Sequence, residues 1–362
     1  MNIEASDISL IYKGRYYQTD KHYLKWGKQE VKGAETAYDY FKIKYPNSNL
    51  TLNKYEYFNK KLSVRDAVLQ AANNNSKIIS GIVFSNHVFE AVDLINKYRM
   101  NLVSSMASSS DLKEYDRVIS VFPSNTSLLK SLFSFLKGKQ ITFRRICVIY
   151  SADDECSINL AELIQQKKNN LFLEKSNITL FPIITRGNLT DEIKNYARNL
   201  TSNDAIFLAL QNFDAAYIVN KIIKEENNPV LLSTDGFGEN GADFWPAVDK
   251  KIKNKVTGYC VFPWSKEGKR ILNQNFLKLY RHKYNSDPSS LSFFTFKSVF
   301  TSLLIKMNLS KNNILPISKI VKNRSIKNEL LKNGLSFNKQ GFSEDSICII
   351  GLKNGTHTAI NK

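Results

Sequence analysis

The sequence is poor in cysteine and lacks a long hydrophobic run. Its four cysteines are too few and too widely spaced for a disulfide scaffold, and the gaps between them fit no zinc-binding motif. They are Cys147, Cys156, Cys260 and Cys348. No run of about 18 apolar residues occurs, and Lys297 interrupts even the apolar stretch at residues 293–304, so the sequence predicts no membrane-spanning helix. A strand-like segment follows Met1 almost directly and no signal peptide is visible, so we expect either a cytosolic chain or one whose leader has been removed.

The sequence also lacks the common catalytic signatures. It contains no H-E-x-x-H, G-x-S-x-G or Walker A motif, and its four histidines are isolated from one another. The segment GFGENG at residues 236–241 matches G-x-G-x-x-G, but Trp245 and Pro246 follow where the helix of a dinucleotide-binding unit should be established. The next predicted strand, residues 257–262, ends without the acidic residue that would hold a ribose. We therefore expect no enzyme and no cofactor, with a dinucleotide-dependent enzyme as the less favoured alternative.

Acidic residues are scarce relative to basic ones. The 362 residues include 51 Lys and Arg but only 33 Asp and Glu, which gives a formal net charge of +18. Such an excess can serve nucleic acids or anionic membranes. Here the basic residues are scattered along the chain, and no zinc-finger, RNA-recognition or helix-turn-helix pattern accompanies them. We therefore expect a solvated basic surface and no nucleic-acid partner.

What the sequence does contain is a regular alternation of strands and helices. Its length favours two domains at about 150 residues each. Short, nearly continuous apolar segments alternate with segments of helical periodicity, a pattern typical of parallel sheets covered by helices on both faces. The predicted strands are residues 8–12, 50–57, 77–84, 102–105, 117–122, 145–150, 177–181, 205–210, 230–234, 257–262, 346–352 and 356–360. The predicted helices are residues 28–45, 64–73, 88–98, 127–136, 158–167, 191–200, 214–224, 266–284, 289–308 and 316–332.

The order of these elements predicts two sheets between which the chain crosses more than once. The alternation breaks after Trp264, where helices follow one another without strands, and the chain closes with two strands around a turn at Asn354-Gly355. Ser63, with Asp66 three residues later, predicts a capping-box start for the helix at residues 64–73. A boundary that the chain crosses repeatedly favours a hinge, with a ligand cleft between two lobes.

Candidate binding residues follow the predicted strands, because ligands of open α/β sheets lie beyond the carboxyl ends of the strands. A run of small hydroxylated residues, 104–110, follows one strand, and its free backbone N–H groups at a helix start favour a carboxylate or phosphate. Asp235 follows a strand of the other lobe and can neutralise an ammonium group. Together they predict a site for a zwitterion such as an amino acid, although serines that cap a helix and an aspartate that begins a turn explain the same pattern.

WGKQEVKGAETA, residues 26–37, and NLVSSMASSSDL, residues 101–112, are the first of several segments whose order and spacing are those of one known family. They resemble the first helix and the V-I-S-P-S-A-T-S segment of the type 1 periplasmic binding proteins, in particular the ABC-transporter receptors for leucine, isoleucine, valine and related ligands. RICVIYSADD, residues 145–154, is similar to its V-A-V-L-Y-x-D-D strand and loop, and NPVLLSTDGF matches the strand that ends at its acidic residue. The remaining matches are Phe276, Tyr280, Tyr284 and Pro288 with F-x-x-x-Y-x-x-x-Y/F-x-x-x-P, and LSFNKQG with x-x-F-d-x-x-G.

The resemblance, which runs from about residue 7 to the end, implies an α/β protein of the type 1 periplasmic binding fold. In this Venus-flytrap architecture two Rossmann-like lobes, each a parallel sheet covered by helices, are joined by a hinge that the chain crosses several times. The expected lobes are residues 1–121 plus 263–336 and residues 122–262 plus 337–362.

The resemblance also implies a set of ligand-binding residues. By position these are Ser85, Asn86, Met106, Ala107, Ser108, Tyr150, Glu155 and Asp235. The sequence departs from the family at Ser105, where the family has Pro, and at Glu155-Cys156, where it has Tyr-Gly with a ring that packs on the ligand. The loop at residues 13–25 is longer and more charged than is usual. Branched-chain specificity is therefore not implied.

The function that the resemblance implies is that of a solute-binding receptor of an ABC-type importer. Such a receptor closes two lobes over a small polar ligand, here expected to be an amino acid or a related compound, without catalysis or cofactor. It passes the ligand to a membrane permease, which implies a periplasmic or an extracytoplasmic, lipid-anchored location. The alternative that stays open is a ligand-sensing domain of the same fold that reports to a signalling or regulatory partner.

Overall fold

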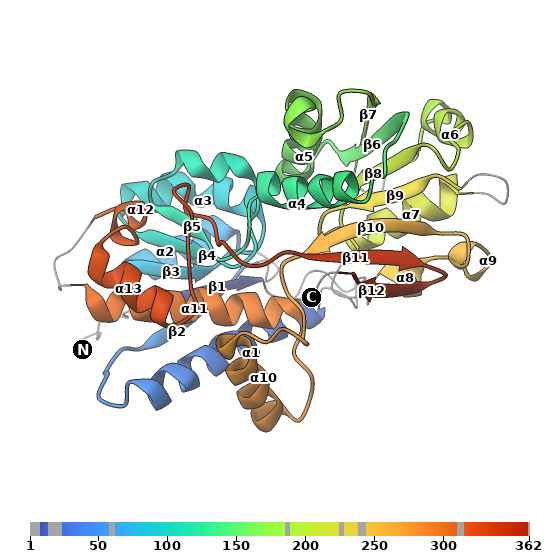
Figure 1. Ribbon diagram of the computed structural model, residues 1–362. Helices are drawn as coiled ribbons and strands as arrows, with labels where there is room; N and C mark the ends of the chain where they lie inside the picture. The colour runs from blue at the N-terminus through green and yellow to red at the C-terminus, as the bar shows by residue number, and fades with distance from the viewer. Residues whose placement is uncertain are drawn as a thin grey trace. The chain divides into compact units, whose positions relative to one another are not determined.

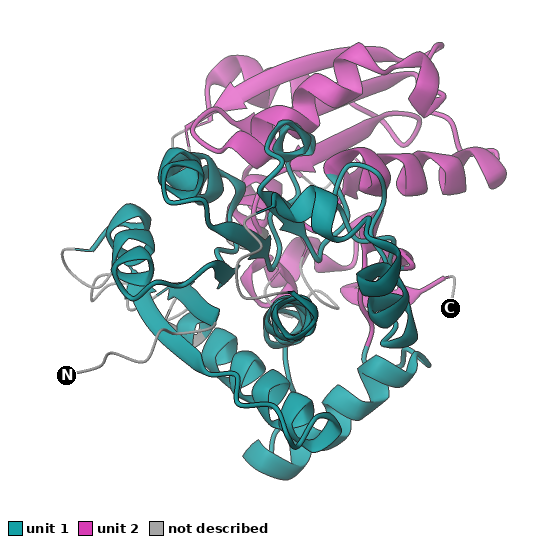
Figure 2. Ribbon diagram, turned by 90° about the vertical axis from the view of Figure 1, so that its left-hand side faces the viewer, with its two compact units in different colours: residues 1–124, 266–345 teal, residues 125–265, 346–362 magenta. Residues whose placement is uncertain are grey.

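The structure is a computed structural model that describes residues 8–13, 24–57, 62–184, 189–223, 228–237, 244–309 and 315–360. The chain forms two compact units, drawn in two colours in Figure 2. Unit 1 comprises residues 1–124 and 266–345, and unit 2 comprises residues 125–265 and 346–362. The chain thus passes between the units three times, after Ser124, after Ser265 and after Asp345. The lobes expected from the sequence change over at 121, 262 and 336, and that division stays a prediction.

Unit 1 is built on a five-stranded parallel sheet in the order β2-β1-β3-β4-β5. Its strands are β1 (Ile8–Lys13), β2 (Leu52–Tyr57), β3 (Ile78–Gly81), β4 (Asn101–Ser104) and β5 (Val118–Ser120). Its longer helices are α1 (Leu24–Lys44), α2 (Val64–Asn73), α3 (Ser85–Lys97), α10 (Ile271–Tyr284), α11 (Ser290–Asn308) and α13 (Arg324–Lys332), as Figure 1 shows. Two short elements, η1 (Ser110–Glu114) and α12 (Ile317–Ile320), complete it.

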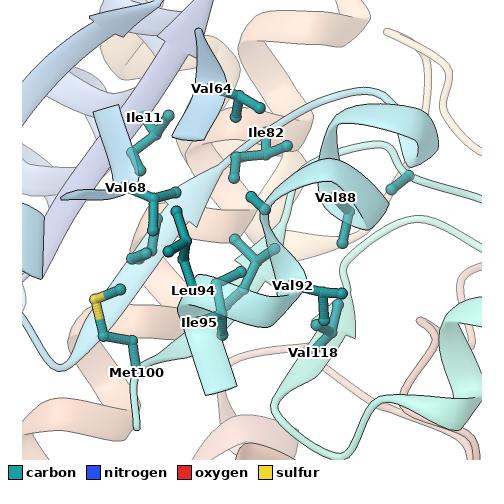
Figure 3. Packing of buried hydrophobic residues seen from close by; sticks show 14 of the residues in the cluster. Ile11, Val64, Val68, Ile82, Val88, Val92, Leu94, Ile95, Met100 and Val118 are labelled. Carbon is teal, nitrogen blue, oxygen red and sulfur yellow. The ribbon is translucent and has the colours of Figure 1, made fainter. Parts of the chain in front are cut away.

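One face of the unit 1 sheet is covered by α2 and α3. The capping box predicted for α2 is confirmed, because the Ser63 hydroxyl accepts the backbone N–H of Asp66 while the Asp66 carboxylate accepts that of Ser63. Apolar side chains of the two helices pack with those of the strands, and Ile11, Val68 and Ile95 belong to one buried cluster (Figure 3). This packing fixes where the first turn of α3 lies beyond the end of β3.

The neighbouring strand positions point to the opposite face, where α11 packs on the sheet. The Ser80 hydroxyl donates to Ser302 at 2.7 Å, and the backbone N–H of Gly81 donates to the Ser298 hydroxyl at 3.1 Å. On its other side α11 runs along α1, and Gly33 allows the two helices to approach closely. A Cβ atom at Gly33 would lie 2.2 Å from the backbone oxygen of Ser292.

Unit 2 is built on a seven-stranded sheet in the order β12-β11-β10-β9-β8-β6-β7. The strands from β7 to β10 are parallel, and β10, β11 and β12 pair antiparallel. The strands are β6 (Arg145–Ser151), β7 (Asn177–Ile183), β8 (Ala205–Ala209), β9 (Val230–Ser233), β10 (Thr257–Phe262), β11 (Cys348–Lys353) and β12 (Thr356–Ala359). The helices are α4 (Asn125–Gly138), α5 (Glu155–Gln166), α6 (Asp191–Arg198), α7 (Asn212–Ile222), α8 (Phe244–Ala247) and α9 (Lys250–Lys253), with a 3-10 turn η2 (Asn169–Leu171).

In unit 2, α4 and α5 contact one another and the strands of the sheet. Aromatic rings join α4 to the sheet, with Phe133 stacked on Phe207 of β8 at 6.4 Å between centroids. At the amino end of the sheet, the fully buried Asp204 carboxylate accepts a hydrogen bond from Arg145 at 2.7 Å and one from the backbone of Thr201. This ion pair holds the start of β8 against the start of β6, which places the two carboxyl ends of these strands side by side.

Several predicted boundaries need correction. Helix α1 begins at Leu24 and not at residue 28, and α5 begins at Glu155 and not at residue 158. Strand β3 ends at Gly81, whose φ of +99° turns the chain, so α3 begins at Ser85 and not at residue 88. The helix predicted at residues 266–284 begins only at Ile271. The helix predicted at residues 316–332 is two short helices, because the Asn323 side chain accepts backbone N–H groups of the next turn and caps a new helix there.

Within the described ranges, no helix combines the length and the apolar character needed to cross a membrane. The four cysteines all lie in the described part of the chain, and no disulfide bond joins them there. Cys147 is fully buried, which raises the pKa of its thiol to about 12, so it packs as a small hydrophobic residue, whereas Cys348 is only half-buried.

Candidate functional site

At the carboxyl edge of the unit 1 sheet, Ser85 organises the loop that follows β4. Ser85 is the first residue of α3 and is 3% exposed. Its hydroxyl oxygen accepts the backbone N–H groups of Ser108 at 3.2 Å and Ser109 at 3.1 Å. The structure thus brings together two of the predicted ligand residues, Ser85 and Ser108, and corrects one point: these two N–H groups are not free but bound to Ser85. The run continues into η1, a short 3-10 turn.

The other predicted residues of unit 1 lie on the same two segments. The backbone N–H of Ala107 donates to the Ser104 hydroxyl at 3.2 Å, and Ala107 is buried. Asn86 and Met106 are half-buried, and the Asn86 side-chain oxygen accepts the backbone N–H of His87 at 2.9 Å. Asn86 and Met106 therefore keep surface with which a ligand can be contacted.

A buried charged pair stands at the same edge of the sheet, and the sequence reasoning did not identify it. Lys13 ends β1, and Glu30 lies on α1, fully buried. The Glu30 Oε2 atom accepts the backbone N–H of Lys13 at 3.1 Å, and its Oε1 atom has no hydrogen-bond partner within the described residues. Burial raises the pKa of Glu30 to about 8, although Lys13 lowers it, and burial lowers the pKa of Lys13 to about 8.

Aromatic rings surround this pair. The Lys13 ammonium lies 4.6 Å from the centroid of Phe84 and 5.6 Å from that of Trp26, and the two rings stack on one another at 5.6 Å. The Tyr57 hydroxyl lies 3.2 Å from Nδ1 of His87, whose pKa is lowered to about 3 by burial, so this imidazole is neutral. A charged residue at the end of an apolar strand was the signal that could have revealed Lys13.

At the carboxyl edge of the unit 2 sheet, the predicted residues come from β6, α5 and the turn after β9. Tyr150 is half-buried near the end of β6, Glu155 is exposed at the start of α5, and Asp235 is half-buried. The Thr234 hydroxyl donates to the Asp235 carboxylate at 3.0 Å, and burial raises the pKa of Asp235. Gly236 is required here because a Cβ atom would lie 2.3 Å from the backbone oxygen of Leu210.

Asp154 joins these residues in one acidic group. Its carboxylate caps α5 by accepting the backbone N–H of Cys156 at 3.2 Å. Burial is the main cause that raises the pKa of Asp154 to about 6. The hydrogen bond from Cys156 acts against it, and the charges of Asp235, Asp153 and Glu155 contribute to the rise. From the sequence alone, the acidic loop at residues 153–155 indicates an ordinary solvated cluster, because only the sheet brings Asp235 close to Asp154.

The other sequence candidates contribute little to these edges. Of the segment GFGENG, only Gly236 and Phe237 belong to the described ranges. Most of the loop at residues 13–25 also lies outside these ranges. Among the described residues, no group of three or more His, Cys, Asp or Glu is placed to hold a metal ion. The unit 1 edge thus carries the buried Ser85 hydroxyl, the half-buried Asn86 amide and the Lys13–Glu30 pair, and the unit 2 edge carries carboxylates.

Three solved structures that are similar to this chain in fold carry names of binding proteins. A leucine-binding protein from Thermotoga maritima is similar to the chain with a TM-score of 0.75 at 13% identity, over 98% of each chain. A branched-chain amino acid transporter substrate-binding protein from Streptococcus pneumoniae, solved with isoleucine, has a TM-score of 0.72 at 16% identity, over 98% of each chain. A solute-binding protein of an ABC transporter from R. palustris, solved with benzoate, has a TM-score of 0.68 at 10% identity, over 99% of this chain and 96% of that one.

The comparison with curated proteins finds no match. A family model described as the receptor family ligand binding region matches residues 34–291, which is more than half of the chain. The sequence-based resemblance and the predicted fold class are confirmed by this match and by the structural neighbours. The chain belongs to the receptor ligand-binding-region family and has the type 1 periplasmic binding-protein fold.

Proposed function

We propose that the protein is the solute-binding receptor of an ABC-type importer and binds an amino acid or a related small polar compound between its two units. The observation that carries the proposal is the complementary chemistry of the two sheet edges. Unit 1 has the Ser85 hydroxyl with the backbone of Ser108 bound to it, while unit 2 has Asp235 with Asp154 close to it. A zwitterion carries the two groups that these edges complement.

In this proposal the ligand carboxylate is held at unit 1. The hydroxyl hydrogen of Ser85 is available to a ligand acceptor because its oxygen already accepts the N–H groups of Ser108 and Ser109. The network around Ser85 holds that hydroxyl in one place before a ligand arrives, which reduces the ordering cost of binding. Ala107 and Met106 supply the adjoining walls, and Asn86 supplies a further amide.

The ligand ammonium is held at unit 2 in the same proposal. Burial is the main cause of the raised pKa of Asp154, and the charge of Asp235 adds to it, so a bound ammonium relieves that repulsion. Tyr150 and Glu155 border the same edge. A ligand that contacts both units stabilises only the closed arrangement, so binding shifts a population and requires no catalytic step.

The partner and the location follow from the structural neighbours. Several of them are named as binding proteins of ABC transporters. We infer that the protein delivers its ligand to a membrane permease and acts outside the cytoplasm, in the periplasm or anchored to a membrane by lipid.

A thermal-shift screen followed by calorimetric titration tests the proposal. The library contains the standard amino acids and, because one neighbour holds benzoate, carboxylates without an amine. We expect at least one amino acid to raise the melting temperature, and Asp235→Asn to weaken its binding about tenfold or more, as loss of a charge-assisted hydrogen bond should.

Glu162→Gln is the matched control, because Glu162 is an exposed carboxylate on α5. It should leave the affinity unchanged. A library without any binder, or equal binding by the parent and the Asp235→Asn variant, would contradict the proposal. Binding of benzoate alone would overturn the assignment of an ammonium site to Asp235.

A further inference from the structure

Lys297 is buried in the middle of α11, in a helix whose other inward residues are apolar or hydroxylated. It is 2% exposed. A buried ammonium is costly unless each of its hydrogens has an acceptor, and a lysine has three. Here all three find one: the backbone oxygen of Val121 at 3.1 Å, the Ser343 hydroxyl at 3.3 Å, and the Asp345 carboxylate.

These acceptors lie in the segments through which the chain leaves unit 1. Val121 stands three residues before Ser124, and Asp345 is the last residue of unit 1. The same two segments pair through their backbones, since Ser120 donates to Gly341 at 2.9 Å and accepts from Ser343 at 2.9 Å. The Lys297 ammonium therefore joins the first and the third passage of the chain to one helix.

The second passage is joined to the same group through Asp345. Arg270, close after the point where the chain re-enters unit 1, donates to the other oxygen of the Asp345 carboxylate at 2.7 Å. Asp345 thus lies between two cations, one buried and one half-exposed. The phenyl ring of Phe122 packs on Phe294 of α11 at 4.8 Å, which adds an apolar contact to the first passage.

We propose that Lys297 is a positioning residue that fixes the unit 1 ends of all three passages as one block. Any movement between the units is then confined to the residues beyond the block. The consequence for ligand binding rests on the function proposed above, because a receptor that closes on its ligand needs three connecting segments that move together. The block itself is a property of the ligand-free chain and can be tested without a ligand.

Native-state hydrogen exchange of the ligand-free protein tests the block, with peptides that cover residues 118–125, 264–272 and 341–348. Lys297→Met fills nearly the same volume without the charge. We expect it to accelerate exchange in all three segments by about tenfold or more, including the second segment, which Lys297 does not touch. Phe300→Leu is the control on the same helix, because Phe300 is buried against Tyr40 of α1, away from the passages.

Lys297→Arg separates anchoring from space filling. Arginine keeps the hydrogen-bond donors but not the shape of lysine. If Lys297 acts as an anchor, protection from exchange in the three segments should be closer to that of the parent protein in Lys297→Arg than in Lys297→Met. A space-filling residue predicts the reverse order, and that result would overturn the proposal. Two results for Lys297→Met would also overturn the proposal. One is faster exchange in only two of the three segments, and the other is a general rise in exchange no different from that of Phe300→Leu.

Arg270→Ala keeps the test decisive if the Lys297 variants do not fold, because Arg270 is half-exposed. It should accelerate exchange at residues 264–272 while the other two segments keep their protection. Unchanged exchange at residues 264–272 would overturn the proposal that the three passages form one block. The outcome is independent of the ligand screen. A protein that binds no amino acid but shows the expected exchange pattern refutes the proposed function and leaves the anchor standing.

Discussion

At Asp154, two features of the structure act in opposite directions on the protonation of one carboxyl group. It caps α5, which favours the charged form, and it stands beside Asp235 in a partly buried position, which favours the proton. Glu30 at the edge of unit 1 is held in a similar way, with burial outweighing the nearby Lys13. At both edges, desolvation is the largest influence on these carboxyl groups.

Asp154→Asn should stabilise the protein at neutral pH. The pKa of Asp154 rises from 3.8 to about 6 on folding, so the folded state binds the proton more tightly and the free energy of unfolding falls as pH increases through this interval. Asparagine caps a helix as well as aspartate and carries no charge. We expect a gain of about 1–2 kcal/mol at pH 7.5, reduced by the partial exposure of Asp154, and almost none at pH 4. Urea denaturation at the two pH values measures it, and an equal gain at both would refute this explanation.

Ser85→Ala should cost about 1–3 kcal/mol, because it removes the buried oxygen that accepts the N–H groups of Ser108 and Ser109. The comparison is Ser134→Ala at an exposed position of α4, which should change stability by about 0.5 kcal/mol or less. Denaturation curves of the two variants give the difference. Equal stabilities would mean that the Ser85 hydroxyl does not organise the loop.

At the scale of elements, the close contact between α1 and α11 depends on a glycine, which has no side chain. Glycine is unfavourable within a helix, and α1 nevertheless carries Gly33 in its interior. The backbone of Ser292 occupies the space in which a side chain would lie. The position of α1 bears on the candidate site, because the same helix carries Trp26 and Glu30.

Gly33→Ala should therefore destabilise the protein by about 2 kcal/mol or more, although alanine is the better helix former, because the new Cβ would lie 2.2 Å from the oxygen of Ser292. Gly138→Ala gives the opposite expectation. Gly138 ends α4, and a Cβ atom there would meet no other atom within 4 Å, so the same substitution should stabilise by about 0.5–1 kcal/mol. Thermal melting of both variants checks the pair, and a stabilised Gly33→Ala variant would show that the helices separate easily.

At the scale of the whole molecule, each unit has its own sheet and its own buried core, as separate domains do. Ser85 and Ser108 belong to unit 1, whereas Asp154 and Asp235 belong to unit 2. The chain passes between the units three times, so neither unit is a continuous stretch of sequence. In the proposed function, a ligand that contacts both groups of residues would couple the two cores.

An amino acid found in the screen should make the protein more compact in solution. Small-angle scattering should show a smaller radius of gyration at saturation, and a ligand at 100 times its Kd should add about 2.7 kcal/mol to the free energy of unfolding. Ser108→Ala and Asp235→Asn should each weaken both effects, since each removes a contact from one unit. Stabilisation without any change in radius would show that the ligand binds to one unit only.

Most of the fold could be predicted from the sequence, because apolar strands that alternate with amphipathic helices are typical of parallel sheets. The failures are local. The positive φ angles at Gly81 and Ile82 end a strand earlier than predicted, and the cap at Asn323 divides a predicted helix in two. Neither feature changes the hydrophobic periodicity from which the elements were predicted. In the site, Ser108 was identified within the run that follows a strand, and Ser85 through the family resemblance. The hydrogen bond between them joins residues 23 apart in sequence.

The sequence by itself determined the alternation of elements, the family and the residues that stand at the strand ends, because these depend on composition, spacing and order along the chain. Only the tertiary structure decided which ionisable side chains lie close together in surroundings with little water. Lys13 with Glu30, Asp154 with Asp235, and Lys297 with Asp345 are each pairs of residues far apart in sequence. Electrostatic energy depends on distance in space and on exclusion of water, and neither quantity can be read from a single chain position.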